Sequence, residues 1–508
     1  MRITNNMITR NTKSNINSNK LLVDKHNTQM TTQKKISKAS ENPVIAIRSL
    51  RLSTNMSRLN QYADNNIPDA NAWMDVTETA LTNMKTLLTD IRTHCVNGST
   101  DTLTPEDRET ILDGLKALAE QVYIEGNADY AGKTVFTGYR TSSTLTFVKD
   151  EPDTVYNITQ DLSFDDLEEK RYFTGDVIVP EAITATTEKC STKISEESYE
   201  RLRLAYGSNI EMNNLSYTID GTETALITTD EDGTVTTAAN VQVFENEAAW
   251  EAANGAREVA DDAMVFIKES GEMIFGKTLA NTISDGRASV RANYTKTGFD
   301  NGELKPEYYY DCVNMTDDDP AKHVTYTKED QKINYTIANN TELTINTQAS
   351  DVFDSSIARD VNELINVVQR AIDANGKVEK LQIMMKEAQY QNDEAQAMLQ
   401  SYLDAAQKEA DYADDNLQKT YEHGITAFDG YLESVTMSIT NVGSMVNRLN
   451  MTKTRVENQQ TTIEDLKSAN EDRDISDIII DYYASYNAYQ SSLTAAGKLG
   501  ERSLLDYI

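Results

Sequence analysis

The sequence predicts an α+β protein in which both chain ends form an elongated α-helical coiled-coil rod, with a β-rich insert domain at the tip of this rod. Three observations lead to this prediction. Apolar residues recur every seven positions near both ends, as in helices that pack along one stripe. Between these regions lie short Val-, Ile-, Thr- and Tyr-rich runs separated by turn residues, which indicates strands. Only 7 Pro and 21 Gly occur in 508 residues, which leaves room for long helices.

The N-terminal half of the rod is predicted over residues 39–140. The residues before it are rich in Asn, Thr and Ser from position 9 to 20, so they form a weak isolated helix. Pro68 interrupts the periodic part, and we predict a kink or break there. Two series with a step of seven define the stripe: Met56, Ala63, Ala70, Thr77, Met84 and Ile91, and Leu52, Leu59, Asn66, Trp73, Ala80 and Leu87.

A second helix of this region has a clear start. Thr104 is a suitable N-cap, Pro105 suits the first turn, and acidic residues follow it. We predict that this helix ends around Gly126 and Asn127 and that Thr134–Phe136 forms a short strand. Its apolar face consists of Ile111, Leu112, Leu115, Leu118 and Val122.

The middle region, residues 141–350, is predicted to be the β-rich insert. Representative strand runs are Val177–Val179, Leu215–Ile219 and Lys332–Ile337. Two short helices are predicted as well, at Ser195–Tyr206 and Glu247–Glu269. The turns that separate these runs contain Asp-Gly or Asp-Asn-Gly and begin at Asp220, Asp232, Asp285 and Asp300.

The C-terminal region has the most regular periodicity, and residues 351–472 are predicted to form the second half of the rod. Its stripe alternates steps of four and three through Tyr421, Ile425, Phe428, Leu432, Val435, Ile439, Val442, Val446 and Leu449. The pattern resumes after a polar stretch and runs almost to the end through Ile475, Ile479, Tyr482, Tyr486, Tyr489, Leu493 and Ala496. Because a lone amphipathic helix is marginally stable, this last stripe needs a partner.

Composition narrows the classes of partner. The net charge of −33 opposes binding to nucleic acid, although residues 1–50 are basic. The insert has more than two acidic residues for every basic one. No apolar run is long enough for a membrane helix, and no cleavable signal is visible, so export requires a dedicated exporter.

The sequence offers no catalytic, cofactor-binding or metal-binding residues that we would assign. The four histidines, His26, His94, His323 and His423, lie far apart in the sequence, and no phosphate-binding Gly loop is present. His94 and Cys95 are better explained as a packed helix end than as a metal pair. Asp317–Asp319 is better explained as a solvated turn than as a weak cation site. The redox state of Cys95, Cys190 and Cys312 stays open.

Several motifs resemble those of the flagellin family, and in particular of the hook-associated proteins that form the hook–filament junction. They are Met1–Met7, Ala39–Leu52 with its Pro43, Asn65–Thr79, Tyr130–Tyr139 and Ala495–Ile508 with its Leu-Asp-Tyr ending. The resemblance covers roughly 1–140 and 351–508, and Tyr294–Cys312 adds a weaker match. Pro43 and the Leu-Asp-Tyr tail favour the junction proteins over the filament flagellins.

The resemblance implies a non-enzymatic structural subunit, outside the cell, at the hook–filament junction of a bacterial flagellum. Its implied partners are copies of itself, neighbouring hook-associated and flagellin subunits, an export chaperone and the flagellar type III exporter. Residues 1–38 and 473–508 are then assembly segments that are disordered in the free monomer and form helices on polymerisation. A filament flagellin and a secreted coiled-coil adhesin are the alternatives.

The last stripe is the candidate site. Tyr offers a large contact area at a low entropic cost, so we interpret this stripe as a subunit contact in preference to a face within the protein's own bundle. The residues proposed for this assembly interface are Ile475, Ile479, Tyr482, Tyr486, Tyr489 and Leu493.

Overall fold

The computed structural model describes residues 5–100, 103–184, 187–230, 234–254 and 257–501. Residues 1–4 and 502–508, which belong to the two terminal motifs, lie outside the described residues. The chain divides into two compact units. Unit 1 contains Met1–Asn71, Asn334–Leu343 and Val446–Ile508, and unit 2 contains Ala72–Ile333 and Thr344–Met445. The long helices α3 (Ile67–Gly98) and α8 (Asp393–Glu471) contribute residues to both units.

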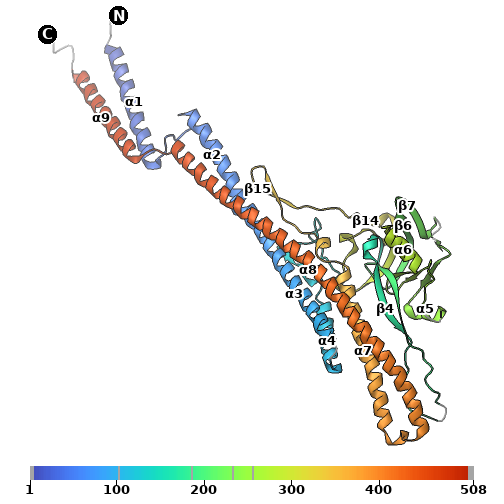
Figure 1. Ribbon diagram of the computed structural model, residues 1–508. Coiled ribbons are helices and arrows are strands. Elements are labelled where there is room, and N and C mark those ends of the chain that lie inside the picture. Colours follow the sequence, from blue (N-terminus) through green and yellow to red (C-terminus); the bar gives the residue numbers. More distant parts are fainter. Residues whose placement is uncertain (1–4, 101–102, 185–186, 231–233, 255–256, 502–508) are drawn as a thin grey trace, which may run out of the picture. The chain divides into compact units, whose positions relative to one another are not determined.

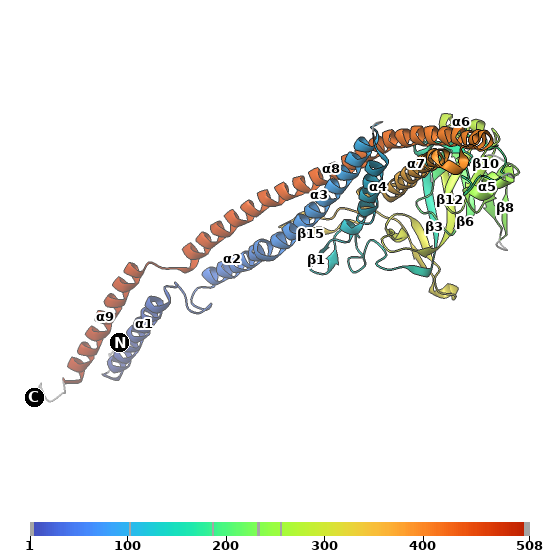
Figure 2. The same ribbon diagram turned by 90° about the horizontal axis from the view of Figure 1, so that it is seen from below.

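Unit 1 is built from antiparallel helix pairs. Helix α1 (Asn5–Thr32) lies along α9 (Ile475–Glu501), and α2 (Pro43–Gln61) lies along the last part of α8 (Figures 1 and 2). Asn42 begins α2, because its side chain accepts hydrogen bonds from the N–H groups of Val44 and Ile45. The second pair has a buried seam of Leu59, Leu449 and Val456.

Two non-helical connections of unit 1 contact each other and form what we call the terminal joint. They are residues 33–42, between α1 and α2, and residues 472–474, between α8 and α9. The backbone N–H of Lys35 donates to the carbonyl of Glu471 at 2.7 Å, and that of Arg473 donates to Gln33 at 2.9 Å. Gln33 has a positive φ of 56°. Both helix pairs therefore end at one hydrogen-bonded turn.

The interruption predicted at Pro68 takes the form of a π-helical turn, η1 (Tyr62–Asn66), which lies between α2 and α3. Pro68 is then in the first turn of α3, where its missing N–H costs little. A hairpin of β15 (Asn334–Ala338) and β16 (Thr341–Thr344) packs on η1, and Asn66 donates to the Thr336 carbonyl at 2.7 Å. This hairpin lies within the sequence range predicted for the insert, and residues 334–343 belong to unit 1.

Helices α3, α4 (Pro105–Ala119), α7 (Ser356–Lys386) and α8 supply the helical part of unit 2. The predicted stripes are buried there. Thr77, Met84 and Ile91 of α3 are inaccessible to solvent. The α8 stripe alternates fully buried residues with half-buried ones, as expected of a coiled-coil seam, and its fully buried members in this unit are Tyr421, Phe428, Val435 and Val442.

Thr104 caps α4 as predicted, and it forms a capping box with Asp107. The helix ends at Ala119, earlier than predicted, and a separate 3-10 turn, η2, covers Ile124–Asn127. The strand predicted at Thr134–Phe136 is mostly absent: β1 (Asp129–Tyr130) pairs with β2 (Lys133–Thr134). Phe136 is buried instead, and its ring packs edge-to-face on Phe353 at 5.0 Å. Burial of that ring outweighs its strand propensity.

Two sheets form the β-rich part of unit 2. In the seven-stranded sheet the order is β14-β13-β3-β12-β6-β7-β8, with all neighbours antiparallel. Its strands are β3 (Glu151–Ser163), β6 (Ile210–Ile219), β7 (Thr222–Thr229), β8 (Val235–Thr237), β12 (Ser289–Phe299), β13 (Asp311–Asn314) and β14 (Val324–Tyr326). The predicted run Leu215–Ile219 is the end of β6, and Asp220 begins the turn to β7 as predicted.

The five-stranded sheet has the order β4-β5-β11-β10-β9, and only β9 and β10 are parallel. Its strands are β4 (Glu168–Thr174), β5 (Ser195–Arg203), β9 (Val241–Phe244), β10 (Met264–Ile267) and β11 (Glu272–Phe275). Residues of both sheets and of α6 (Lys277–Asp285) share one apolar core. A smaller core under α5 (Glu247–Asn254) surrounds the buried Trp250.

The remaining 3-10 turns of the described residues are η3 (Phe164–Asp166), η4 (Pro306–Tyr308), η5 (Pro320–Lys322), η6 (Ala349–Asp351) and η7 (Ala388–Tyr390).

Several predictions for the insert were wrong. Ser195–Tyr206 is not a helix, because β4 and β11 pair with both edges of β5 and sheet pairing overrides local propensity. The predicted helix Glu247–Glu269 stops at Asn254, because the apolar run that follows is the fully buried strand β10. Val177–Val179 is not in a sheet, and the Val177 N–H donates to Glu409 of α8 at 3.0 Å instead. Asp285 ends α6 and does not separate two strands. Asp232 lies outside the described residues.

The predicted fold class is confirmed. Long helices occupy both chain ends, and a β-rich region lies between them in the sequence. In the described residues, no helix is both long enough and apolar enough to cross a membrane.

Candidate assembly surface

The candidate stripe on α9 is divided between two environments. Tyr482 and Tyr489 are half-buried, whereas Ile475, Ile479, Tyr486 and Leu493 keep 38% to 45% of their surface accessible. Tyr482 stacks on Tyr486 with ring centroids 6.1 Å apart, so the covered and the exposed rings form one aromatic row. We call the four exposed side chains the α9 stripe.

The seam between α1 and α9 is thin. Half-buried positions recur in steps of three and four on both helices, and on α1 half of them are polar: Ile8, Thr12, Ile16, Asn19, Val23 and His26. Only Ile478 of α9 and Gln29 of α1 are fully buried in this pair, within its described residues. One seam hydrogen bond runs from the Asn19 amide to the Ala488 carbonyl at 3.4 Å. The pair thus buries little apolar surface of its own.

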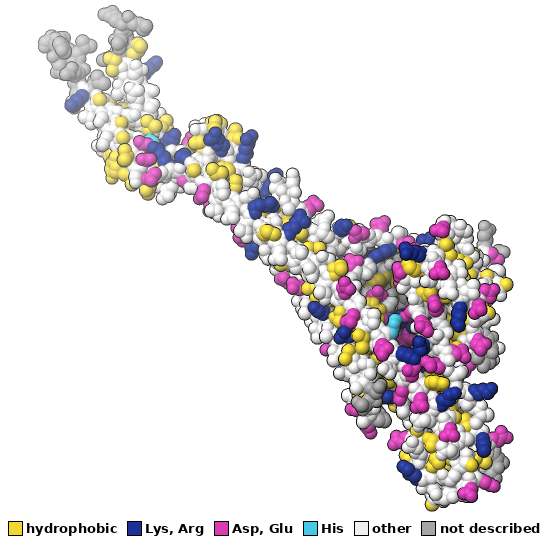
Figure 3. All heavy atoms as spheres, viewed as in Figure 1, with side chains coloured by type: hydrophobic (Ala, Val, Ile, Leu, Met, Phe, Trp, Pro, Cys, Tyr) yellow, Lys and Arg dark blue, Asp and Glu magenta, His cyan; other side chains and the backbone are white. Residues whose placement is uncertain are grey.

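Further apolar side chains of the α1/α9 pair are exposed. Ile480 and Tyr483 of α9 and Leu21 and Leu22 of α1 are 45% to 66% accessible. Hydrophobic side chains are visible on the surface of this helix pair in Figure 3. Covering the part of one such side chain that is still exposed contributes about 1 kcal/mol, so the surface favours a further apolar partner.

The terminal joint fixes the start of α9 through charged groups. Lys34 reaches Asp472 at 2.5 Å and Glu471 at 3.2 Å. These contacts raise the pKa of Lys34, chiefly through the hydrogen bond to Asp472. Arg473 donates to Gln29 at 3.3 Å and also pairs with Asp481 of α9. Because these groups are mostly solvated, each pair contributes at most about 1 kcal/mol.

A charged cluster in unit 2 was missed by the sequence analysis. Arg201 of β5 is buried and contacts Glu272 and Glu363 at 2.5 Å each and Glu168 at 3.1 Å. Lys170 joins Glu272 at 2.9 Å. Burial raises the pKa of Glu272, but Lys170 and Arg201 outweigh this effect and lower it to about 2. The cluster attaches the five-stranded sheet to α7, and abundant carboxylates elsewhere in the sequence concealed it.

The histidines and cysteines lie in separate surroundings. The His94 ring packs where a side chain on Gly114 of α4 would be, so it belongs to a helix contact. Cys95 is buried, which raises its pKa to about 12, and all three cysteines are free. Asp317 accepts from Lys322 at 3.0 Å in an exposed turn. Among the described residues, no group of three His, Cys, Asp or Glu side chains is arranged to hold a metal ion.

Comparison with known protein families gives a match in the N-terminal part of the chain. Residues 3–141 match the bacterial flagellin N-terminal helical region. The resemblance to flagellins stated from the sequence motifs is thereby confirmed for the N-terminal region. The N-terminal helical part of the chain is therefore flagellin-like in sequence. No curated protein is significantly similar to it in sequence.

Comparison with solved structures gives several flagellar proteins at low identity and low TM-score. A protein of Vibrio parahaemolyticus, provisionally assigned as a flagellar hook-associated protein, has 12% identity and a TM-score of 0.36 over 85% of this chain and 100% of its own. The flagellar junction protein FlgL of Legionella pneumophila has 9% identity and a TM-score of 0.30, over 84% and 100%. Flagellar hook-associated protein 3 of the same organism has 10% identity and a TM-score of 0.29, over 82% and 96%.

Proposed function

We propose that the protein is the structural subunit that joins hook to filament, the role of hook-associated protein 3, and that it assembles through the α9 stripe. The observation that carries this proposal is the thin α1/α9 seam in a flagellin-like chain. The pair leaves Ile475, Ile479, Tyr486 and Leu493 exposed although α1 already covers the other side of α9. A helix pair of this kind gains stability mainly when further helices cover it.

The proposed partners follow from this surface. They are neighbouring copies of the chain and the hook-associated and flagellin subunits on either side. We further propose that a flagellar chaperone and the type III exporter deliver the chain, and that it acts outside the cell. The polar seam residues of α1 support this route, because a weakly held helix pair unfolds at a small cost in free energy. The role is structural, and no reaction is assigned to it.

Assembly is tested with Tyr486→Ser combined with Leu493→Ser, in cells that lack their own copy of the gene. We expect loss of filaments and motility, while the free energy of unfolding of the purified monomer changes by less than about 0.5 kcal/mol. Met451→Ser is the matched control, because Met451 is 70% accessible on α8 in the same unit. Normal filaments in the double variant would contradict the proposal.

The position of the protein along the flagellum distinguishes the junction role from that of a filament flagellin. The distinction is needed because residues 3–141 match the flagellin N-terminal region. Immunogold labelling of the wild-type protein should place it in a short zone next to the hook. Labelling along the whole filament would instead make it a flagellin.

A further inference from the structure

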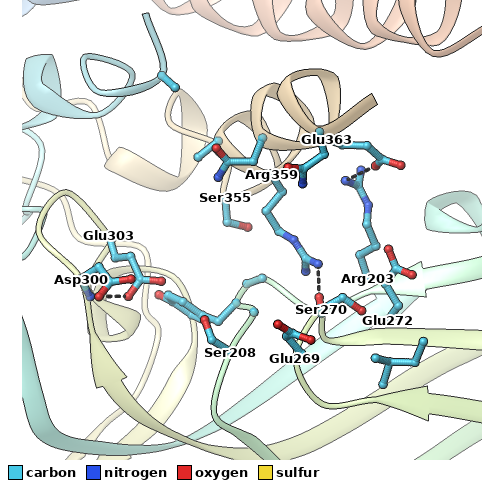
Figure 4. Close-up of a pocket in the computed structure, with 18 of the residues that line it drawn as sticks. Arg203, Ser208, Glu269, Ser270, Glu272, Asp300, Glu303, Ser355, Arg359 and Glu363 are labelled. Atoms are coloured by element: carbon cyan, nitrogen blue, oxygen red, sulfur yellow. Dashed lines mark hydrogen bonds and ion pairs between the residues drawn. The ribbon is translucent and has the colours of Figure 1, made fainter. Parts of the chain in front are cut away.

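A cleft of about 1020 Å³ lies within unit 2, between the first turns of α7, the end of α4 and the loops of the two sheets. Figure 4 shows Arg359 reaching from α7 toward Ser270, in the turn between β10 and β11. Arg203 and Glu363 lie on one side of it, and Asp300 and Glu303 on the other. The flagellar role proposed above makes no use of this cleft.

Four of the five basic side chains that line the cleft are neutralised. Lys170 pairs with Glu272 at 2.9 Å and Arg203 with Asp360 at 2.6 Å. Arg257 pairs with Glu251 at 3.2 Å and with Glu247 at 2.6 Å, and Glu247 also lies 3.6 Å from Arg370. These ion pairs leave little free positive charge along most of the lining.

Arg359 is the exception. Among the described residues it has no carboxylate partner, and its Nη2 donates to the backbone carbonyl of Ser270. Its Nη1 is buried and has no hydrogen-bond partner there. Burial, together with the nearby Arg203, lowers the pKa of Arg359 to about 10, so the group is still charged at neutral pH. Glu272 and Glu363 offset part of the cost of burying this charge, and an anion that reached Nη1 would offset more of it.

Ser270 supplies a second donor at the same place. Its hydroxyl oxygen is also buried and without a hydrogen-bond partner in the described structure. Gly271 holds this turn with a φ of +64°, and a Cβ there would lie 2.4 Å from the Tyr206 carbonyl. The turn therefore requires glycine, and it presents the Ser270 hydroxyl next to the guanidinium of Arg359.

The rest of the lining is suited to hydroxyl groups. Asn362, Asn366 and Gln369 follow Arg359 on α7 and line the cleft, together with Ser208. Amide side chains both donate and accept, as sugar hydroxyls do. Glu120, Glu269 and Asp300 also line the cleft, and their charges oppose a dianion such as phosphate more strongly than a monoanion.

We propose that this cleft binds an acidic sugar, a small hydroxylated molecule with one carboxylate. The carboxylate accepts hydrogen bonds from Nη1 of Arg359 and from the hydroxyl of Ser270. The sugar hydroxyls bond to the amides of α7. The one lining cation without a carboxylate contact among the described residues thus meets one anionic charge, and the two unpartnered donors obtain acceptors.

The probe is glucuronate, and its binding to the full-length protein is measured by calorimetry. Glucose, acetate and inorganic phosphate are measured in parallel. We expect glucuronate to bind roughly ten- to hundredfold more tightly than glucose, the change expected from a charge-assisted contact. It should also bind more tightly than acetate, which lacks the hydroxyls, and than phosphate. Equal affinity for glucose and glucuronate, tighter binding of phosphate, or no binding of glucuronate would overturn the proposal.

Variants locate the site. Arg359→Gln should lower the affinity for glucuronate by at least about tenfold, and Ser270→Ala by a smaller factor in the same direction. Arg370→Gln is the matched control, since Arg370 lies in the same lining but is paired with Glu247, and it should stay within about twofold of the wild type. If Arg359→Gln fails to fold, Ser270→Ala decides, because unchanged affinity in that variant contradicts the proposed contact.

Discussion

Helices α8 and α9 carry the same kind of stripe in the sequence but use it differently. In unit 2, Phe428 and Val435 of α8 are inaccessible to solvent. In unit 1, Ile475 and Tyr486 of α9 keep 45% and 38% of their surface accessible. A seven-residue repeat therefore identifies a helix that needs a partner, but it does not say whether the partner lies in the same molecule. The four predictions below test this contrast, from the largest expected effect on stability to the smallest.

The largest loss is expected in the buried seam. Phe428→Ala removes a fully buried ring from α8, so the free energy of unfolding should fall by about 3–5 kcal/mol in chemical denaturation. Met437→Ala on the same helix is the control, because Met437 is 59% accessible, and it should change stability by less than about 0.5 kcal/mol. Similar losses in both variants would mean that the α8 stripe is not a core.

Disrupting the buried charged cluster should lower the free energy of unfolding by a similar amount. The stability that the cluster contributes should also depend on pH in a characteristic way. The pKa of Glu272 is lowered to about 2 from its ordinary 4.5, so the unfolded chain takes up the proton first as the pH falls. Its contribution is complete above about pH 4.5 and is lost toward pH 2. Glu272→Gln should cost about 3–5 kcal/mol at neutral pH and flatten the pH dependence of stability in this range.

The control for that cluster is the exposed pair of Asp161 and Arg291, whose side chains contact at 2.6 Å. Asp161→Asn should cost less than about 1 kcal/mol in the same denaturation series. An equal cost for the two variants would show that burial does not strengthen the cluster.

Two glycines test how closely the helices pack. A Cβ on Gly98 would lie 2.3 Å from the Tyr421 ring, so Gly98→Ala should destabilise unit 2 by about 1–3 kcal/mol. Gly430 of α8 has no atom near the position of such a Cβ. Gly430→Ala should therefore raise the free energy of unfolding by about 0.5–1 kcal/mol, through better helix propensity. Opposite signs in the thermal melts of the two variants are the expected result.

The free energy of local unfolding should be smallest in the terminal helices. In hydrogen exchange on the monomer, we expect the amides of 1–38 and 473–508 to exchange at once, while 45–125 and 355–450 are protected. The physical reason is the thin α1/α9 seam, in which few side chains are fully buried. Equal protection of both regions would mean that the α1/α9 pair is already stable in the monomer, and the assembly role of these segments would lose its support.

The candidate stripe could be predicted only in part. Periodicity places Ile475, Tyr482, Tyr486 and Leu493 on one side of a helix, and they do lie along α9. Whether α1 covers each of them depends on the angle at which the two helices pack, which the pattern does not contain. Tyr482 is half-buried, whereas Tyr486 is exposed.

The sequence by itself determined the long helices, the Thr104 cap and the turn at Asp220, because spacing, capping and turn chemistry are local properties. Only the tertiary structure decided that Ser195–Arg203 is a strand, because two neighbouring strands supply its hydrogen bonds. It also decided the partners of Arg201, and it left Nη1 of Arg359 without a hydrogen-bond partner among the described residues. The surroundings of both side chains come from segments far apart in the chain. Burial and charge compensation are properties of the assembled neighbourhood, which no single stretch of sequence specifies.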